Sequence, residues 1–204
     1  MTFSFENFEY DETNLIDRSI DESGAYVGEF LQVAVLCSKN TGTHGLRFEF
    51  AADEGGIVKI DIYVQKADGT KLFGADTVGA VKKVLGLSRF EVVEENIEKY
   101  DFEKKEKVLE MGKVVKNLEN KKIGLVLRKK IEDHMTKPGE VRISYEIVEV
   151  FHPISRLTAG ELAAGVKEAK KLDKRLKSLK DKDVRKVSSV SAASALSLPD
   201  EVDF

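Results

Sequence analysis

Cysteine is almost absent from this sequence, since Cys37 is the only one in 204 residues. A single cysteine excludes an internal disulfide, which fits a reducing compartment. Histidine is also scarce, and His44, His134 and His152 are too scattered to supply the ligand spacing of a zinc site. We therefore expect neither a metal ion nor a cofactor.

Long apolar runs are missing as well. No run approaches the roughly 20 residues that a membrane helix needs. The acidic amino terminus lacks the succession of basic, apolar and small residues that marks a signal peptide. These two observations favour a cytoplasmic protein that does not associate with membranes.

Common enzyme signatures do not occur in the chain. It contains no GxSxG, HExxH, Walker or GxGxxG motif. Carboxylates are abundant, but none lies beside a histidine or a nucleophile in a pattern that stands out. We expect a protein without enzymatic activity, and an active site assembled from residues far apart in sequence is the alternative that a motif search leaves open.

Three consecutive β-strands are predicted after a short amino-terminal arm. They cover residues 26–38, 46–52 and 57–65. Asparagine and glycine mark the turns between them. On the second strand, Leu46, Phe48 and Phe50 alternate with charged residues. A period of two over so many residues predicts an antiparallel meander with one buried face.

A helix and two further strands are predicted after the meander. They cover residues 76–87, 122–132 and 141–150, with an insertion at about residues 88–120. This element order is that of the OB-fold, a five-stranded, partly open barrel that binds single-stranded nucleic acids or oligosaccharides. The expected fold class is therefore mainly β, with a five-stranded antiparallel OB-like barrel over residues 26–155 and a helix between its third and fourth strands.

Charge is unevenly distributed, although the net charge is only −3. Residues 1–24 carry a charge of −6, residues 158–187 carry +5, and residues 188–204 carry −3. We expect residues 1–25 to form an arm packed on the edge of the barrel. An acidic head and tail around a neutral to basic body indicate either a basic partner or the self-masking of a basic site.

The pattern after the barrel predicts a basic amphipathic helix over residues 156–187. Apolar residues recur there at steps of three and four, and Thr158 with Glu161 forms a capping-box pattern. The apolar side of such a helix packs on the body of the protein or on a second copy, so a homodimer is one expectation. Contact with a membrane or with nucleic acid is the alternative. Residues 188–204 are expected to form a flexible acidic tail, because its serine and alanine run cannot build a core.

The outward face of the predicted strands is equipped to bind a single strand. Such binding needs cations along the phosphates and flat rings under the bases. The candidate DNA-binding residues are Phe30, Arg47, Lys59, Tyr63, Lys66, Lys71, Phe73, Arg128, Lys130 and Arg142. Their convergence on one predicted face indicates nucleic-acid binding, whereas Phe30 belongs to the core if the barrel closes.

At the carboxyl terminus, a charged helix and a serine- and alanine-rich linker precede Asp200, Glu201, Asp203 and the terminal Phe204. This ending resembles the tails of bacterial and phage single-stranded DNA-binding proteins. The DEVDF ending is similar to the tails of T7-type phage proteins. The segments 71–74 (KLFG) and 85–87 (LGL) resemble a phage family of OB-fold single-stranded DNA-binding proteins, and this resemblance covers about residues 26–150.

The resemblance implies a protein that coats and protects single-stranded DNA without strong sequence preference in phage DNA replication, recombination and repair. It also implies that the four tail residues recruit phage or host replication and recombination proteins and compete with DNA for the basic groove. A phage-encoded protein of this kind would lie in the host cytoplasm. The alternative is a non-enzymatic protein–protein interaction module or a virion-structural β-barrel, which the absence of tryptophan favours.

Overall fold

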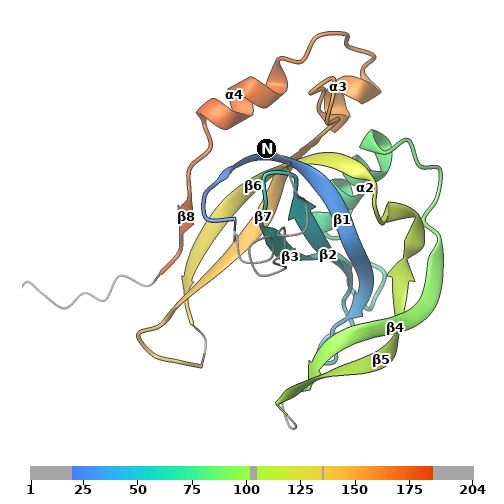
Figure 1. Cartoon of the computed structure of the whole chain (residues 1–204), viewed down its shortest axis with the longest axis vertical. Helices are drawn as coiled ribbons and strands as arrows, with labels where there is room; N and C mark the ends of the chain where they lie inside the picture. Colours follow the sequence, from blue (N-terminus) through green and yellow to red (C-terminus); the bar gives the residue numbers. More distant parts are fainter. Residues whose placement is uncertain (1–19, 102–104, 135, 186–204) are drawn as a thin grey trace, which may run out of the picture.

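The computed structural model describes residues 20–101, 105–134 and 136–185 (Figure 1). Most of the arm predicted for residues 1–25 lies outside the described residues, and so does the acidic tail of residues 188–204. The expectations for these two segments therefore stay predictions.

The described chain is mainly β, with eight strands in one sheet that is antiparallel except for its last strand. The long strand β1 (Gly24–Cys37) is its centre. On one side β1 pairs with β2 (His44–Ala52), which pairs with β3 (Ile57–Gln65). On the other side it pairs first with β6 (Lys122–Asp133) and further along with β5 (Glu106–Val115).

The alternation predicted for the second and third strands is confirmed. Leu46, Phe48 and Phe50 of β2 are buried, and so are Val58 and Ile60 of β3. The two strands pair as neighbours, with Phe48 opposite Ile60. Residues two apart on a strand point to the same face, so both strands turn one apolar face to the core.

The helix predicted after the meander is α2 (Gly74–Val84), which buries Val78, Val81 and Val84. It starts tightly against β3, since a Cβ on Gly74 would lie 2.3 Å from the carbonyl oxygen of Tyr63. At 11 residues it is the longest of the described helices. None of them is long and apolar enough to cross a membrane.

The predicted five-stranded OB-like barrel is not confirmed, because the sheet is open. β6 pairs with β7 (Val141–Phe151), but no ladder joins β3 to β7 within the described residues. α2 lies against both of these strands and contributes its apolar face to the same core. The coarser prediction, a mainly β antiparallel structure, holds.

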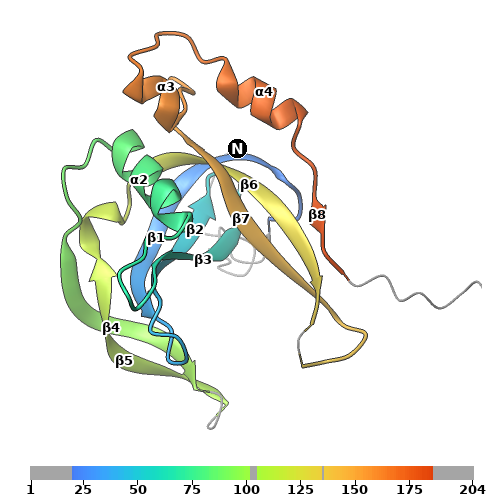
Figure 2. The same cartoon turned by 180° about the vertical axis from the view of Figure 1, so that it is seen from behind.

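The insertion predicted at residues 88–120 is a long hairpin of β4 (Val92–Asp101) and β5, followed by the short helix η1 (Lys116–Leu118). Ala34 of β1, Ile97 and Val114 form a small separate core at the base of this hairpin. Figures 1 and 2 show the hairpin reaching away from the end of the molecule where the last two helices lie. It therefore forms a projecting wall beside β1.

The single helix predicted over residues 156–187 is wrong, because the chain forms two short helices and a strand there. These are α3 (Ala159–Ala163), α4 (Lys171–Lys177) and β8 (Lys182–Asp183). The capping box of Thr158 and Glu161 is confirmed at the start of α3. Gly165 then adopts a φ of 66°, a left-handed conformation that glycine accommodates after a helix end.

The buried Glu161 carboxylate fixes this break in the helix. One oxygen accepts from the backbone N–H and hydroxyl of Thr158, and the other accepts from the backbone N–H groups of Lys170 and Lys171. The first residues of α4 are thereby tied to the cap of α3. The backbone N–H groups of Lys170 and Thr158 lower the pKa of Glu161 to about 2.

Candidate nucleic-acid interface

The solvent-facing side of β2 and β3 carries the polar residues that alternate with the core. We call this surface the outer face and define it by Arg47, Glu49, Lys59, Asp61 and Tyr63. Their parity was correctly predicted from the sequence, because neither strand is interrupted between these residues. The outer face is therefore a product of regular strand geometry.

The charges of the outer face are paired across the two strands. Arg47 donates two hydrogen bonds of 2.7 Å to the carboxylate of Asp61, which lies directly opposite. Lys59 forms an ion pair of 3.0 Å with Glu49. The hydrogen bond to Asp61 raises the pKa of Arg47 above its ordinary value. Exposed pairs contribute only about 0.2–1 kcal/mol, so a phosphate can displace either acid.

Two exposed aromatic rings extend the outer face at one end of β3. Tyr63 is 42% exposed and Phe73 is 87% exposed. The chain before α2 runs back along β3, since the N–H of Leu72 donates to the carbonyl of Val64 at 2.8 Å. The two uncovered rings therefore belong to adjacent segments, and uncovered rings are the surfaces on which nucleic-acid bases stack.

Two predicted lysines flank the turn between β3 and Phe73. The N–H of Lys66 donates to the carbonyl of Thr70 at 2.9 Å and closes this turn. The backbone of Lys71 forms an isolated antiparallel β-bridge with Gln65. The ammonium group of Lys71 lies 2.8 Å from the carboxylate of Asp76. The structure thus gathers six of the predicted residues along β2, β3 and the following turn: Arg47, Lys59, Tyr63, Lys66, Lys71 and Phe73.

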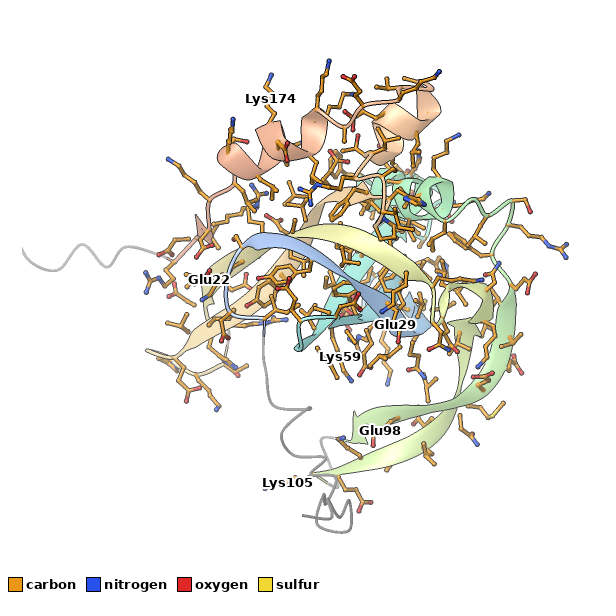
Figure 3. All side chains as sticks on the ribbon, turned by 45° about the horizontal axis from the view of Figure 1, so that its top comes forward. Glu22, Glu29, Lys59, Glu98, Lys105 and Lys174 are labelled. Carbon is orange, nitrogen blue, oxygen red and sulfur yellow. The ribbon has the colours of Figure 1, made fainter. Side chains whose placement is uncertain are left out.

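A hollow of about 280 Å³ lies between the outer face and the hairpin. Its lining residues are Leu31, Gln32, Ala34, Val35, Leu36, Arg47, Glu49, Lys59, Ile97 and Glu98. Figure 3 shows Lys59 on β3, at one side of this hollow, and Glu98 on β4 of the hairpin, at the other side. The sequence did not predict the hairpin wall, whose apolar lining residue Ile97 lies in a charged stretch. A bound strand would be bordered here by protein on two sides.

Phe30 does not belong to this interface, contrary to the prediction. Its side chain is fully buried, with ring centroids 5.0 Å from Phe48 and 5.9 Å from Phe50. The pairing of β1 with β2 shifts register between Phe30 and Gln32. This bulge reverses the alternation, so Leu31 is 40% exposed instead and lines the hollow.

Arg128, Lys130 and Arg142 lie on a different surface from the outer face. They belong to β6 and β7, beside β8, and each has an acidic partner. Arg128 pairs with Glu146, while Lys130 and Arg142 both pair with Glu132. The structure therefore divides the ten predicted residues into six at the outer face and its turn, one in the core and three on β6 and β7.

Across residues 20–101, 105–134 and 136–185, no group of three or more histidine, cysteine or acidic side chains is arranged to hold a metal ion. Glu161, whose pKa is lowered to about 2, lies in the α3–α4 junction, where hydrogen bonds satisfy its carboxylate.

In comparisons with protein-family models and with curated proteins, this chain matches none of them.

Proposed function

We propose that this protein binds single-stranded DNA along the outer face without strong sequence preference. The observation that carries the proposal is the row formed by Lys59 and Tyr63 on β3, with Arg47 beside it and Phe73 at its end. Cations that contact phosphates and rings that stack on bases are the two requirements for sequence-tolerant binding of a single strand. No catalytic step is proposed.

We further propose that the strands around this face form an OB-like barrel with the β4–β5 hairpin inserted. Support comes from the order of three strands, helix and two strands, and from β1, which pairs with both β2 and β6. OB-folds bind oligonucleotides on the face of their second and third strands. The outer face occupies the corresponding strands here.

The proposed role is to coat and protect single-stranded DNA during phage replication, recombination and repair in the host cytoplasm. The tail residues Asp200, Glu201, Asp203 and Phe204 would recruit phage or host replication and recombination proteins. This part of the proposal is supported by the resemblance of the carboxyl-terminal sequence. DNA and those proteins are the two classes of partner it implies.

Titration with fluorescent oligo-dT tests the proposal directly. We expect saturable binding of oligo-dT that weakens as salt rises, with a matched duplex bound more weakly because its bases are not available for stacking. Oligo-rU in parallel measures the preference between DNA and RNA. Absence of oligo-dT binding at low salt would contradict the proposed function.

Tyr63→Ala should weaken oligo-dT binding by about 1–3 kcal/mol, the usual contribution of one stacked base. Tyr63→Phe is the matched control, because it keeps the ring and removes only the hydroxyl. We expect the phenylalanine variant to bind like the wild type in the same fluorescence titration. Equal affinity for all three proteins would show that no base stacks on this side chain.

Removing residues 200–204 should tighten oligo-dT binding, most strongly at low salt. The tail carboxylates follow the linker of residues 188–198, which is expected to be flexible, so they compete with phosphates at high effective concentration. Neutralising Asp200, Glu201 and Asp203 to amides should reproduce the effect, whereas Phe204→Ala should impair partner recruitment and retain the masking. Unchanged low-salt affinity in the truncated protein would exclude masking.

A protein–protein interaction module, or a virion-structural barrel, is the second candidate. Two observations favour it: Arg47 and Lys59 are already paired with acids, and Leu109 and Met111 on β5 are 71% and 64% exposed. Exposed apolar side chains that lie together mark interaction surfaces. Stable self-association in sedimentation without any oligo-dT binding would favour this candidate, and oligo-dT binding would favour the first.

A further inference from the structure

The apolar side of α4 is already occupied by the body of the protein. Leu172 is 1% exposed and forms a cluster with Val126 and Phe151, against which Leu176 and Leu179 also pack. A basic amphipathic helix enters a membrane through its apolar side. Because that side is covered here, α4 presents its polar residues for any external contact.

The polar side of α4 is a basic hollow. Lys171, Lys174, Arg175 and Ser178 line a space of about 320 Å³ together with Glu149 of β7. Within the described residues, neither Lys171 nor Lys174 takes part in an ion pair, and Arg175 approaches Glu149 only to 4.0 Å. This arrangement differs from the outer face, where Arg47 and Lys59 are each matched by a close acid.

The positive charge continues from α4 onto the neighbouring strands. β8 pairs with β6, with Lys182 opposite Lys130. Glu146 is shared by Arg128 and Lys182, and Glu132 is shared by Lys130 and Arg142. One carboxylate cannot neutralise two cations, so each of these two clusters keeps a net positive charge. We call this surface the α4 band: Lys171, Lys174, Arg175, Lys182, Arg128, Lys130 and Arg142.

We propose that the α4 band is a second binding surface, which holds the phosphate backbone of a single strand. The exposed aromatic rings of the described chain, Tyr63 and Phe73, lie outside it. The α4 band therefore offers phosphates partners but offers bases no stacking surface, and its contribution is independent of sequence. The inference rests on the proposed function, because it takes single-stranded DNA as the ligand.

Strand length distinguishes the two surfaces. A strand of about 8 nucleotides is within the range that one OB-fold accommodates, and it would occupy the outer face with its stacking rings. A strand of about 40 nucleotides exceeds that range and can extend onto the α4 band. Only the long strand is therefore expected to respond to charge changes on α4.

The test compares Lys171→Gln/Lys174→Gln with Lys82→Gln/Lys83→Gln in the full-length protein. Both double variants remove two positive charges from a helix surface, and Lys82 and Lys83 lie in the last turn of α2, outside the α4 band. Affinities for oligo-dT of about 8 and 40 nucleotides are measured between about 50 and 200 mM salt. Far-UV circular dichroism and thermal unfolding verify that both variants remain folded.

For the long strand, the α4 variant should reduce the log–log salt slope by about 1.4, because each phosphate contact on a single strand contributes about 0.7. We expect the α2 variant to keep the wild-type slope for both strands, and the α4 variant to keep it for the short strand. Equal slopes in the two variants would exclude the α4 band as a binding surface. Absence of wild-type binding to either strand would instead overturn the proposed function, and this inference with it.

Discussion

Replacing Phe30 with alanine should lower the free energy of unfolding by about 3–5 kcal/mol, the usual cost of truncating a buried phenylalanine. The ring of Phe30 on β1 is fully buried and packs against the rings of Phe48 and Phe50 on β2. Its removal leaves a cavity in the centre of the largest core cluster. Urea denaturation followed by circular dichroism measures the loss.

Leu31→Ala is the matched control for this experiment, since it truncates the next residue on the same strand. Leu31 is 40% exposed and lines the hollow beside the hairpin. We expect its truncation to cost about 1 kcal/mol or less, because only part of its apolar surface is removed from water. A Phe30→Ala protein of unchanged stability that lost oligo-dT binding would return Phe30 to the interface.

Glu161→Ala should destabilise the α3–α4 junction by about 3 kcal/mol or more. Glu161 is 3% exposed, and its carboxylate accepts four hydrogen bonds of 2.8–3.0 Å, three of them from backbone N–H groups. Each buried polar group left without a partner costs about 1–3 kcal/mol. Hydrogen exchange should show the amides of Lys170 and Lys171 losing protection, and urea denaturation should show the loss of stability.

Glu168→Ala controls for the loss of one acid in the same segment. Glu168 is exposed and pairs only with the neighbouring Lys170 at 3.3 Å among the described residues. We expect a change within about 0.5 kcal/mol, as for most surface substitutions. Equal stability of the two variants would contradict a structural role for the Glu161 carboxylate.

The effect of Glu161→Ala should also depend on pH. Backbone hydrogen bonds from Lys170 and Thr158 lower the pKa of Glu161 from 4.5 to about 2 in the folded protein. The ionised carboxylate therefore contributes its full stabilisation above about pH 4.5 and loses it as the pH falls towards about 2. The stability difference between wild type and variant should narrow over this window. A difference that stays constant down to pH 2 would contradict the assigned hydrogen bonds.

Local patterns predicted the regular strands and α2, because an element that is buried on one side has apolar residues at regular intervals in the sequence. β2 and β3 alternate without interruption, so both their pairing and the residues of the outer face could be inferred. The hairpin of β4 and β5 displays no such period. Among its residues with described side chains, only Ile97, Val114 and Val115 are buried, so most of its positions carry no signal from the core.

Periodicity was misleading at two places where a nonlocal contact overrides it. The leucine pattern after residue 158 fits one continuous helix, but Glu161 captures the N–H groups of Lys170 and Lys171 and separates α3 from α4. On β1, the bulge after Phe30 shifts the alternation by one residue, so the residues that face the core change from even-numbered to odd-numbered positions. Neither the helix break nor the bulge changes the residue pattern of its segment, so the sequence pattern could not predict either of them.

The sequence by itself determined the five principal strands, the helix after the third strand, the buried side of β2 and β3, and the capping box at Thr158. Each of these features depends on residues that lie close together in the sequence, within one or two helical turns or a few strand positions. Only the tertiary structure decided that the sheet stays open, that Phe30 is core, and that the predicted cations belong to two surfaces. Those outcomes depend on which distant segments share a face, because packing and cross-strand ion pairs form between residues that the sequence does not place together.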